Sequence, residues 1–268
     1  MKRSDGHGFV TDAETPYVAS WGGTGEQVVL VHGDAPIGPL AWLSQRRLRD
    51  RYTLSVLTRA GYGQRSALRI DARRDADDLC AALSEPVHLI GHSHGAVVAA
   101  LATAAAPDLV RSVTLIEPPL FQVAADEPEV QAVLREADAL FGTVTAGPIP
   151  AGTLSALFGG QGADFATPEW SLLRTKVMES VLPWTYPIDF AGLRGRVSAL
   201  VVCGAWSAAF TAVCERIARE LSAPCVRIPG AGHSPHLVEV EFDQVLLRHL
   251  AAAGEPNPLP SADFARPI

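Results

Sequence analysis

Apolar residues follow two alternating patterns along most of the chain. In the first pattern, short runs are almost free of polar residues and rich in β-branched side chains, which is typical of strands buried on both faces of a sheet. These predicted strands are 27–32, 52–57, 86–91, 112–117, 197–204 and 225–228. Two weaker β signals, at 8–11 and 17–21, predict an antiparallel hairpin at the edge of the same sheet.

The second pattern, with apolar residues at helical spacing, lies between the strands. It predicts helices at 71–83, 96–106, 208–221 and 239–253. The helix at 96–106 consists almost entirely of Ala, Val and Leu, so we expect it to be buried on all sides. Strands that alternate with helices predict an α/β fold, with a mainly parallel sheet, helices on both faces and right-handed crossovers.

The stretch 119–193 breaks this alternation. It contains helical patterns at 127–141 and 168–181 but no convincing strand. In an α/β sheet, an insertion of this size after a strand end lies over the carboxyl edge, where ligands bind. We therefore predict a helical cap at 119–193, inserted in an α/β core that is formed by 1–118 and 194–268.

Composition narrows the class of protein. Of the 268 residues, 48% are hydrophobic and 19% are charged, which indicates a globular protein with a large core. The net charge of −7 argues against nucleic acid or an anionic membrane as a partner. No segment resembles a signal peptide or approaches the roughly 20 apolar residues of a membrane span. The four cysteines show no C-x-x-C spacing. We expect a cytoplasmic protein without metal or cofactor that acts on a small molecule; the oligomeric state is not indicated.

One pentapeptide, Gly-His-Ser-His-Gly, carries the chemistry. It fits the pattern G-x-S-x-G and lies directly after a predicted strand and directly before the buried helix. Such a sharp turn holds the serine in a strained backbone conformation, and side chains at Gly91 and Gly95 would clash. The N–H of His94 points toward a developing oxyanion at the helix N-terminus. We therefore predict Ser93 as the nucleophile; the simpler interpretation is a glycine-rich turn without a chemical role.

Three further motifs surround this turn in an order that resembles the α/β-hydrolase family, and the resemblance covers nearly the whole chain. The pair at 32–33 resembles the family's HG turn, which implies that the N–H of Asp34 is the second oxyanion donor. Segment 59–66 resembles the D-x-x-G-x-G-x-S loop, with its leading acid replaced by Arg59. Segment 230–233 resembles the loop that carries the catalytic histidine.

The resemblance implies that His233 is the general base for Ser93. A serine hydroxyl is a poor nucleophile until a neighbouring base removes its proton, and imidazole titrates in the right range. Other histidines compete for this role. We expect the side chains of His92 and His94 to point away from the nucleophile or into the pocket wall, and His32 to form structural hydrogen bonds.

The acid that completes a triad departs from the commonest family pattern. The usual G-x-x-D motif reads Gly-Ala-Trp-Ser at 204–207, and Ser207 cannot stabilise a positive charge as a carboxylate does. Some relatives, zearalenone-type lactonases among them, carry the acid after the strand that follows the nucleophile helix. Glu117 occupies that position, so we expect it to reach His233. The alternative is that Glu117 only caps strand-end backbone and that Ser207 substitutes for the acid.

Asp34 is a second departure. A carboxylate that points into the oxyanion hole would oppose the negative charge that develops there. We therefore expect its side chain to turn toward solvent. The alternative is that it handles a proton or a cationic group of the substrate.

A serine nucleophile favours acyl transfer to water. We predict a serine hydrolase that cleaves a carboxylic ester or lactone of a small, largely apolar molecule through an acyl-enzyme. The acid position alone favours the lactone. A thioester or C–C bond hydrolase, a non-catalytic small-ligand binder and a cofactor-free oxygenase or lyase are the alternatives. The aromatic residues expected to line the pocket are Phe121, Phe141, Phe158, Trp184 and Tyr186.

Overall fold

A computed structural model of the protein describes residues 17–34, 38–142 and 180–254. Their centre is a seven-stranded sheet with the order β1-β3-β2-β4-β5-β6-β7, in which only β1 runs antiparallel to its neighbour. The α/β prediction and all six strongly predicted strands are confirmed. The strands are β1 (Tyr17–Gly23), β2 (Gln27–Val31), β3 (Thr53–Thr58), β4 (Val87–His92), β5 (Val110–Ile116), β6 (Ser198–Gly204) and β7 (Cys225–Ile228).

The edge strand β1 differs from the expected hairpin. It confirms the weak β signal at 17–21, but it pairs with β3, beginning at Tyr17 opposite Thr58. Strand β3 offers its backbone groups on this side because β2 pairs with its other side, and an added antiparallel strand satisfies them. The segment 8–11, predicted as the hairpin partner, lies outside the described residues.

Five α-helices are described, and they match the predicted helical segments closely. They are α1 (Ala72–Ala82), α2 (His94–Ala105), α3 (Pro128–Gly142), α6 (Ala208–Leu221) and α7 (Glu239–Gly254). Asp71 caps α1 by accepting a hydrogen bond from the N–H of Arg73 at 2.9 Å. A segment of 3₁₀ turns at Gly38–Asp50 was not predicted; its helical geometry is interrupted at Trp42, which has a φ of −123° and a ψ of 16°.

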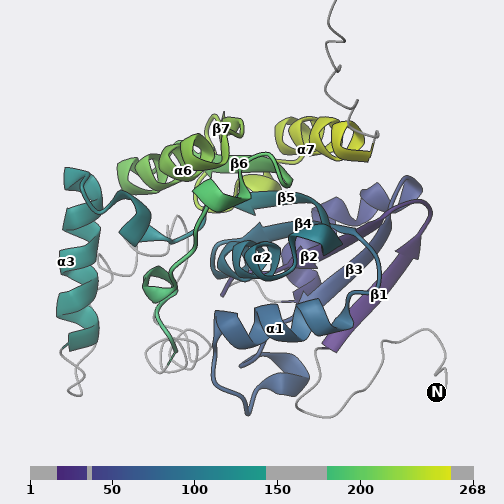
Figure 1. The fold of residues 1–268 in the computed structure, drawn as a ribbon, viewed down its shortest axis with the longest axis horizontal. Coiled ribbons are helices and arrows are strands. Elements are labelled where there is room, and N and C mark those ends of the chain that lie inside the picture. Colours follow the sequence, from purple (N-terminus) through teal and green to yellow (C-terminus); the bar gives the residue numbers. More distant parts are fainter. Residues whose placement is uncertain (1–16, 35–37, 143–179, 255–268) are drawn as a thin grey trace, which may run out of the picture.

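The helices form a layer on each face of the sheet (Figure 1). Apolar side chains of α1, α2 and α6 pack on one face, against Leu89 and Val113 among others. The segment Gly38–Asp50 and α7 cover the opposite face, where Ile90 and Ile116 lie. Helix α2 is buried from His94 to Thr103, as its composition predicts. This arrangement leaves the carboxyl ends of the strands for the loops that carry chemistry.

The chain between β5 and β6 is described only at its two ends. Helix α3 extends away from the sheet and packs beside α6 (Figure 1). The returning chain forms short 3₁₀ turns at Pro183–Thr185 and Ala191–Leu193. The predicted helix 168–181 lies outside the described residues except for its last two positions, so the cap at 119–193 stays a prediction. Among the described helices, none combines the length and apolarity that crossing a membrane requires.

Candidate active site

Ser93 lies in a tight turn between β4 and α2. Its φ of 53° is in the left-handed region, which a non-glycine residue adopts only when its surroundings enforce it. A Cβ on Gly91 would lie 2.3 Å from the carbonyl oxygen of Gly95, and one on Gly95 would lie 2.2 Å from that of Val31. The N–H of Ser93 donates to the carbonyl of Ile116 at 2.8 Å, which ties the turn to β5. The expected need for glycines at both flanking positions is confirmed.

The imidazole of His233 faces this serine from the loop after β7. Its Nε2 lies 2.9 Å from Ser93 Oγ, within hydrogen-bond distance. Two side chains hold this loop in place through hydrogen bonds to its backbone. His92 Nε2 lies 2.8 Å from the backbone carbonyl of His233, and Gln45 Nε2 donates to the carbonyl of His236 at 2.8 Å. His92 thus points away from the nucleophile, as expected.

Glu117 follows the last residue of β5 and reaches the other nitrogen of the same ring. Its Oε2 lies 3.2 Å from Nδ1 of His233, and its side chain is fully buried. A φ of 48° turns the residue out of the strand, while its N–H donates to Val202 of β6 at 2.9 Å. The structure therefore brings Ser93, His233 and Glu117 into one hydrogen-bonded chain that crosses three strand ends.

Ser207 caps a helix and is not hydrogen-bonded to His233. Its hydroxyl accepts a hydrogen bond from the N–H of Phe210 at 3.4 Å and so caps the N-terminus of α6. The residues before it contact Glu117 instead. The N–H of Gly204 donates to Oε1 at 2.6 Å, and the indole N–H of Trp206 donates to Oε2 at 3.0 Å. The sequence motifs assign no role to Gly204 or Trp206, although the strand at 197–204 ends at the same sheet edge as Glu117.

Asp34 does not turn toward solvent, so that expectation was wrong. Its side chain is 11% exposed and pairs with the guanidinium of Arg59 at 3.0 Å. It also accepts a hydrogen bond from the hydroxyl of Tyr62 at 2.7 Å and lies 3.4 Å from Nδ1 of His94. A fully buried arginine nearby makes solvent the less favourable environment for this carboxylate, because each charge compensates the other.

The ionisation of Asp34 follows from these neighbours. Burial alone acts to raise its pKa, but His94, Arg59 and the hydroxyl of Tyr62 outweigh burial and hold the pKa well below its ordinary value. Burial and the charge of Arg59 also lower the pKa of His94. Since the His94 ring is then neutral near pH 7, Arg59 supplies the lasting positive charge beside the carboxylate.

Arg59 explains how the chain accommodates the missing acid of segment 59–66. Its guanidinium is fully buried and lies between Asp34 and Asp75, with 3.4 Å from Nε to Asp75 Oδ2. It also donates to the backbone carbonyl of Gly33 at 3.1 Å. The arginine therefore ties the turn that contains Asp34 to the start of α1. His32 forms structural hydrogen bonds, as expected, with its Nε2 accepting from the N–H of Arg59 at 3.2 Å.

Two backbone segments lie close to Ser93, the start of α2 and the turn at Gly33. His94 is the first residue of α2, so its N–H has no acceptor within the helix and lies at the positive end of the helix dipole. The HG turn approaches closely, since a Cβ on Gly33 would lie 3.0 Å from Cβ of Ser93. Such an arrangement can stabilise negative charge that develops beside the serine.

The family model described as "Alpha/beta hydrolase family" matches residues 28–245. This stretch runs from β2 into α7 and includes Ser93, Glu117 and His233. The chain belongs to the α/β-hydrolase family. Comparison with curated protein sequences finds no match.

Solved structures share the fold of this α/β hydrolase at low sequence identity. A thermophilic esterase from Thermogutta terrifontis is 23% identical, with a TM-score of 0.61 over 90% of this chain and 95% of its own. Est816, described as an N-acyl homoserine lactone degrading enzyme, is 19% identical, with a TM-score of 0.63 over 90% and 98% of the two chains. MenH from S. aureus is 16% identical, with a TM-score of 0.66 over 89% and 99%. At these identities the likeness shows the fold alone.

In this α/β hydrolase a row of aromatic rings leads from His233 toward the predicted cap. The ring of Phe210 lies 4.8 Å from that of His233, Phe121 lies 5.2 Å from Phe210, and Trp184 lies 5.6 Å from Phe121. Phe121 is buried and Trp184 is half-buried. Phe210 was not among the expected pocket residues, because its position in the predicted helix 208–221 gave no sign that it would face His233.

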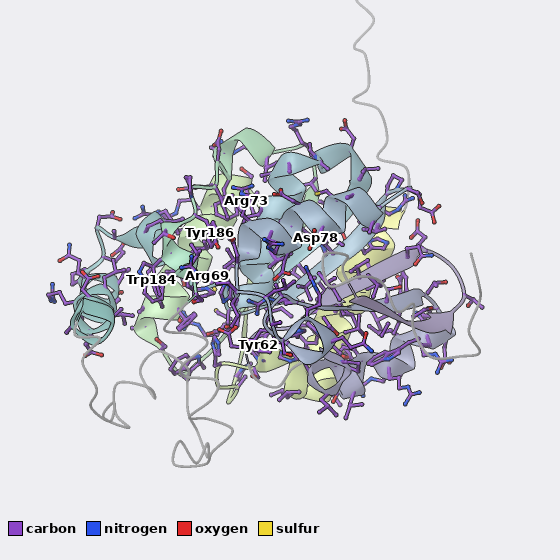
Figure 2. All side chains as sticks on the ribbon, turned by 90° about the horizontal axis from the view of Figure 1, so that it is seen from below. Tyr62, Arg69, Arg73, Asp78, Trp184 and Tyr186 are labelled. Carbon is purple, nitrogen blue, oxygen red and sulfur yellow. The ribbon has the colours of Figure 1, made fainter. Side chains whose placement is uncertain are left out.

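The side chain of Tyr186 forms structural hydrogen bonds at the start of α1. Its hydroxyl donates to the carboxylate of Asp71 at 2.7 Å and accepts from the N–H of Ala72 at 3.0 Å. In Figure 2, Tyr186 lies at the start of α1 near Arg73, and Trp184 lies farther out on the same segment. Tyr186 therefore joins the returning chain to α1. The side chain of Phe141 and the whole of Phe158, also expected in the pocket, lie outside the described residues.

Proposed function

We propose that this α/β hydrolase is a serine hydrolase that cleaves a carboxylic ester or lactone of a small, largely apolar molecule. The observation that carries the proposal is the distance of 2.9 Å between Ser93 Oγ and His233 Nε2, with Glu117 at 3.2 Å behind the ring. This order of side chains supports the roles of Ser93 as nucleophile, His233 as base and Glu117 as orienting acid in acyl transfer.

The first half of the reaction forms an acyl-enzyme. Ser93 Oγ attacks the carbonyl carbon while its proton passes to Nε2 of His233, and Glu117 stabilises the imidazolium. The N–H groups of His94 and Asp34 donate to the oxyanion of the tetrahedral intermediate. Its collapse breaks the bond to the alcohol oxygen, which takes the proton from Nε2. In a lactone this alcohol stays attached to the acyl group.

The second half returns the enzyme to its starting state. A water molecule gives a proton to Nε2 of His233, and its oxygen attacks the acyl carbon. The second tetrahedral intermediate collapses with release of the carboxylic acid, and Ser93 Oγ regains the proton from Nε2. Glu117 orients the ring of His233 in both halves, and two N–H donors hold its buried carboxylate in place for this role.

Two features support the substrate class. The aromatic row of Phe210, Phe121 and Trp184 gives the side of the site next to His233 an apolar character, which favours an apolar acyl or alcohol group. A lactone is favoured by the position of Glu117 after β5, as in the lactonases that the sequence resembles, and one structural neighbour is named for lactone degradation.

The decisive experiment combines labelling with turnover. The purified protein is incubated with a fluorophosphonate probe and assayed with p-nitrophenyl butyrate, an aliphatic γ-lactone and a thioester of the same acyl group. We expect labelling and ester or lactone hydrolysis in the wild type, and neither in Ser93→Ala, which keeps the Cβ in the turn. Folded wild-type protein that is not labelled would refute the proposal and favour a ligand binder. If the thioester is turned over faster than the ester and the lactone, the protein is a thioester hydrolase instead.

A further inference from the structure

Trp206 contacts the Glu117–His233 pair from the connection between β6 and α6. Its indole N–H donates to Oε2 of Glu117 at 3.0 Å, and the same oxygen lies 3.2 Å from Nδ1 of His233. The other oxygen, Oε1, accepts from the N–H of Gly204 at 2.6 Å. Two donors from one short segment therefore fix both oxygens of the carboxylate.

The surroundings explain why these donors matter. Glu117 is fully buried, and a carboxylate withdrawn from water is stable as an anion only where N–H donors replace its hydration. The ring of Trp206 is held in turn by aromatic neighbours, with centroids 5.3 Å from Phe210 and 5.8 Å from His233. Because the indole is rigid, it restricts where Oε2 can lie.

We propose that Trp206 is a positioning residue for the acid–base pair, whose indole N–H holds Oε2 of Glu117 against Nδ1 of His233 and favours the ionised carboxylate. The segment 204–207, which lacks the usual acid, supplies hydrogen-bond donors to an acid on the neighbouring strand. The kinetic consequence rests on the proposed hydrolase function, whereas the effect on ionisation does not.

Three other titratable side chains near the pair are neutral at neutral pH. The ring of His92 lies 5.0 Å from that of His233 and 4.4 Å from that of His236. Burial lowers the pKa of His92 well below its ordinary value and that of His236 to about 3. Cys214 of α6 faces Glu117, and burial raises its thiol pKa well above the ordinary value. A change in the titration of the pair therefore reports on its hydrogen bonds.

The first test is the pH profile of kcat/KM in Trp206→Phe, which keeps a ring but removes the donor. Without the indole N–H, Oε2 of Glu117 can move away from Nδ1 of His233, so the imidazolium loses part of the charge that stabilises it and the pKa of His233 should fall. We expect the acidic limb to move to lower pH by about one unit and kcat to fall about 10-fold or more, because the imidazolium formed in the reaction is less stabilised. Trp206→Gln, which keeps an N–H donor without the ring, should restore most of the limb position.

Trp21→Phe is the matched control, since Trp21 lies on β1 at the opposite edge of the sheet, where it stacks with Arg46. The same substitution there should leave the profile as in the wild type. A limb in Trp206→Phe that coincides with that of Trp21→Phe would overturn the positioning role and leave only packing.

A second measurement separates this inference from the proposed function. The pKa of His233 is measured by NMR of the ¹⁵N-labelled imidazole in wild type and Trp206→Phe, with or without turnover. A lowered pKa of His233 in the variant supports the inference even if no ester is hydrolysed, and an unchanged or raised pKa overturns it. If Trp206→Phe fails to fold, benzothienylalanine at position 206 removes the N–H with the ring shape kept, and the same two outcomes decide.

Discussion

The guanidinium of Arg59 and the carboxylate of Asp34 form an ion pair, with 3.0 Å between Nη1 and Oδ1. Arg59 occupies the position where the family's loop carries an acid, and Asp34 follows the HG turn. The pair therefore joins the two loops that border Ser93 on this side. Since Arg59 also donates to the carbonyls of His32 and Gly33, it fixes the backbone whose N–H we assign to the oxyanion hole.

This pair should be strongly coupled in stability. Asp34→Ala leaves a buried guanidinium with one fewer acidic partner, so we expect a loss of about 3 kcal/mol in the free energy of unfolding. Arg59→Met alone should also be costly, but the double variant should be much less destabilised than the sum of the two. Urea unfolding of the three variants measures the coupling, and additivity within about 0.5 kcal/mol would refute the pairing.

The acid assignment predicts unequal effects at two positions. Glu117→Gln removes the charge that stabilises the imidazolium, so we expect kcat to fall by about 10³–10⁴-fold. Ser207→Ala removes only a helix cap, so we expect a loss of about 1 kcal/mol in stability and little change in kcat. Steady-state kinetics with p-nitrophenyl butyrate compares them. Small and similar losses of kcat in both variants would contradict a catalytic role of Glu117.

Buried neutral histidines predict acid sensitivity. Burial, assisted by Arg59 for His32 and by His233 for His236, lowers the pKa of both groups to about 3. In the unfolded chain they titrate near pH 6.5, so below about pH 6.5 the unfolded state binds more protons and stability falls by roughly 1.4 kcal/mol per pH unit for each histidine. Urea unfolding between pH 7 and pH 4 measures this slope.

The variant His236→Phe tests the origin of that slope. The ring of His236 is fully buried beside Trp42, so a phenyl ring can occupy its place. We expect the slope to fall by about 1.4 kcal/mol per pH unit, since one titrating group is removed. Leu246→Ala on α7 should lower stability at every pH without changing the slope. Equal slopes in His236→Phe and wild type would contradict the assignment.

Two glycines near the site should respond differently to a methyl group. A Cβ on Gly95 would overlap the carbonyl of Val31, so Gly95→Ala should cost about 3 kcal/mol or more and abolish fluorophosphonate labelling. A Cβ on Gly232 would meet no atom within 4 Å, so Gly232→Ala should change stability by less than about 0.5 kcal/mol. Thermal unfolding compares the two, and tolerance of Gly95→Ala would contradict the tight turn.

Much of this fold can be predicted from the sequence because parallel strands that are buried on both faces leave long apolar runs. The meeting of Ser93, Glu117 and His233 also follows, since each residue comes after a strand and parallel strands end at one edge. The predicted strand 112–117 was one residue too long at that edge, where Glu117 turns to a φ of 48°.

The contacts around the site could not be predicted in the same way. The pairing of Asp34 with Arg59 depends on the direction in which a long side chain extends between two loops. Both residues lie in loops, where no periodic pattern of the sequence indicates side-chain direction. Trp206 was hidden for a similar reason. The usual motif has its acid at position 207, whereas here the indole one residue earlier supplies the contact with Glu117.

Ser93 and Glu117 both have a positive φ, and each donates its backbone N–H to a carbonyl of the neighbouring strand, at Ile116 and Val202 respectively. A slip of β5 by one residue would break both of these hydrogen bonds and turn Glu117 to the opposite face of the sheet. Reactivity of Ser93 toward a phosphonate therefore serves as a reporter of alignment between β4, β5 and β6. During refolding, chains with misaligned strands would not react with the phosphonate. The rate at which labelling appears would therefore measure how fast β4, β5 and β6 reach their native alignment.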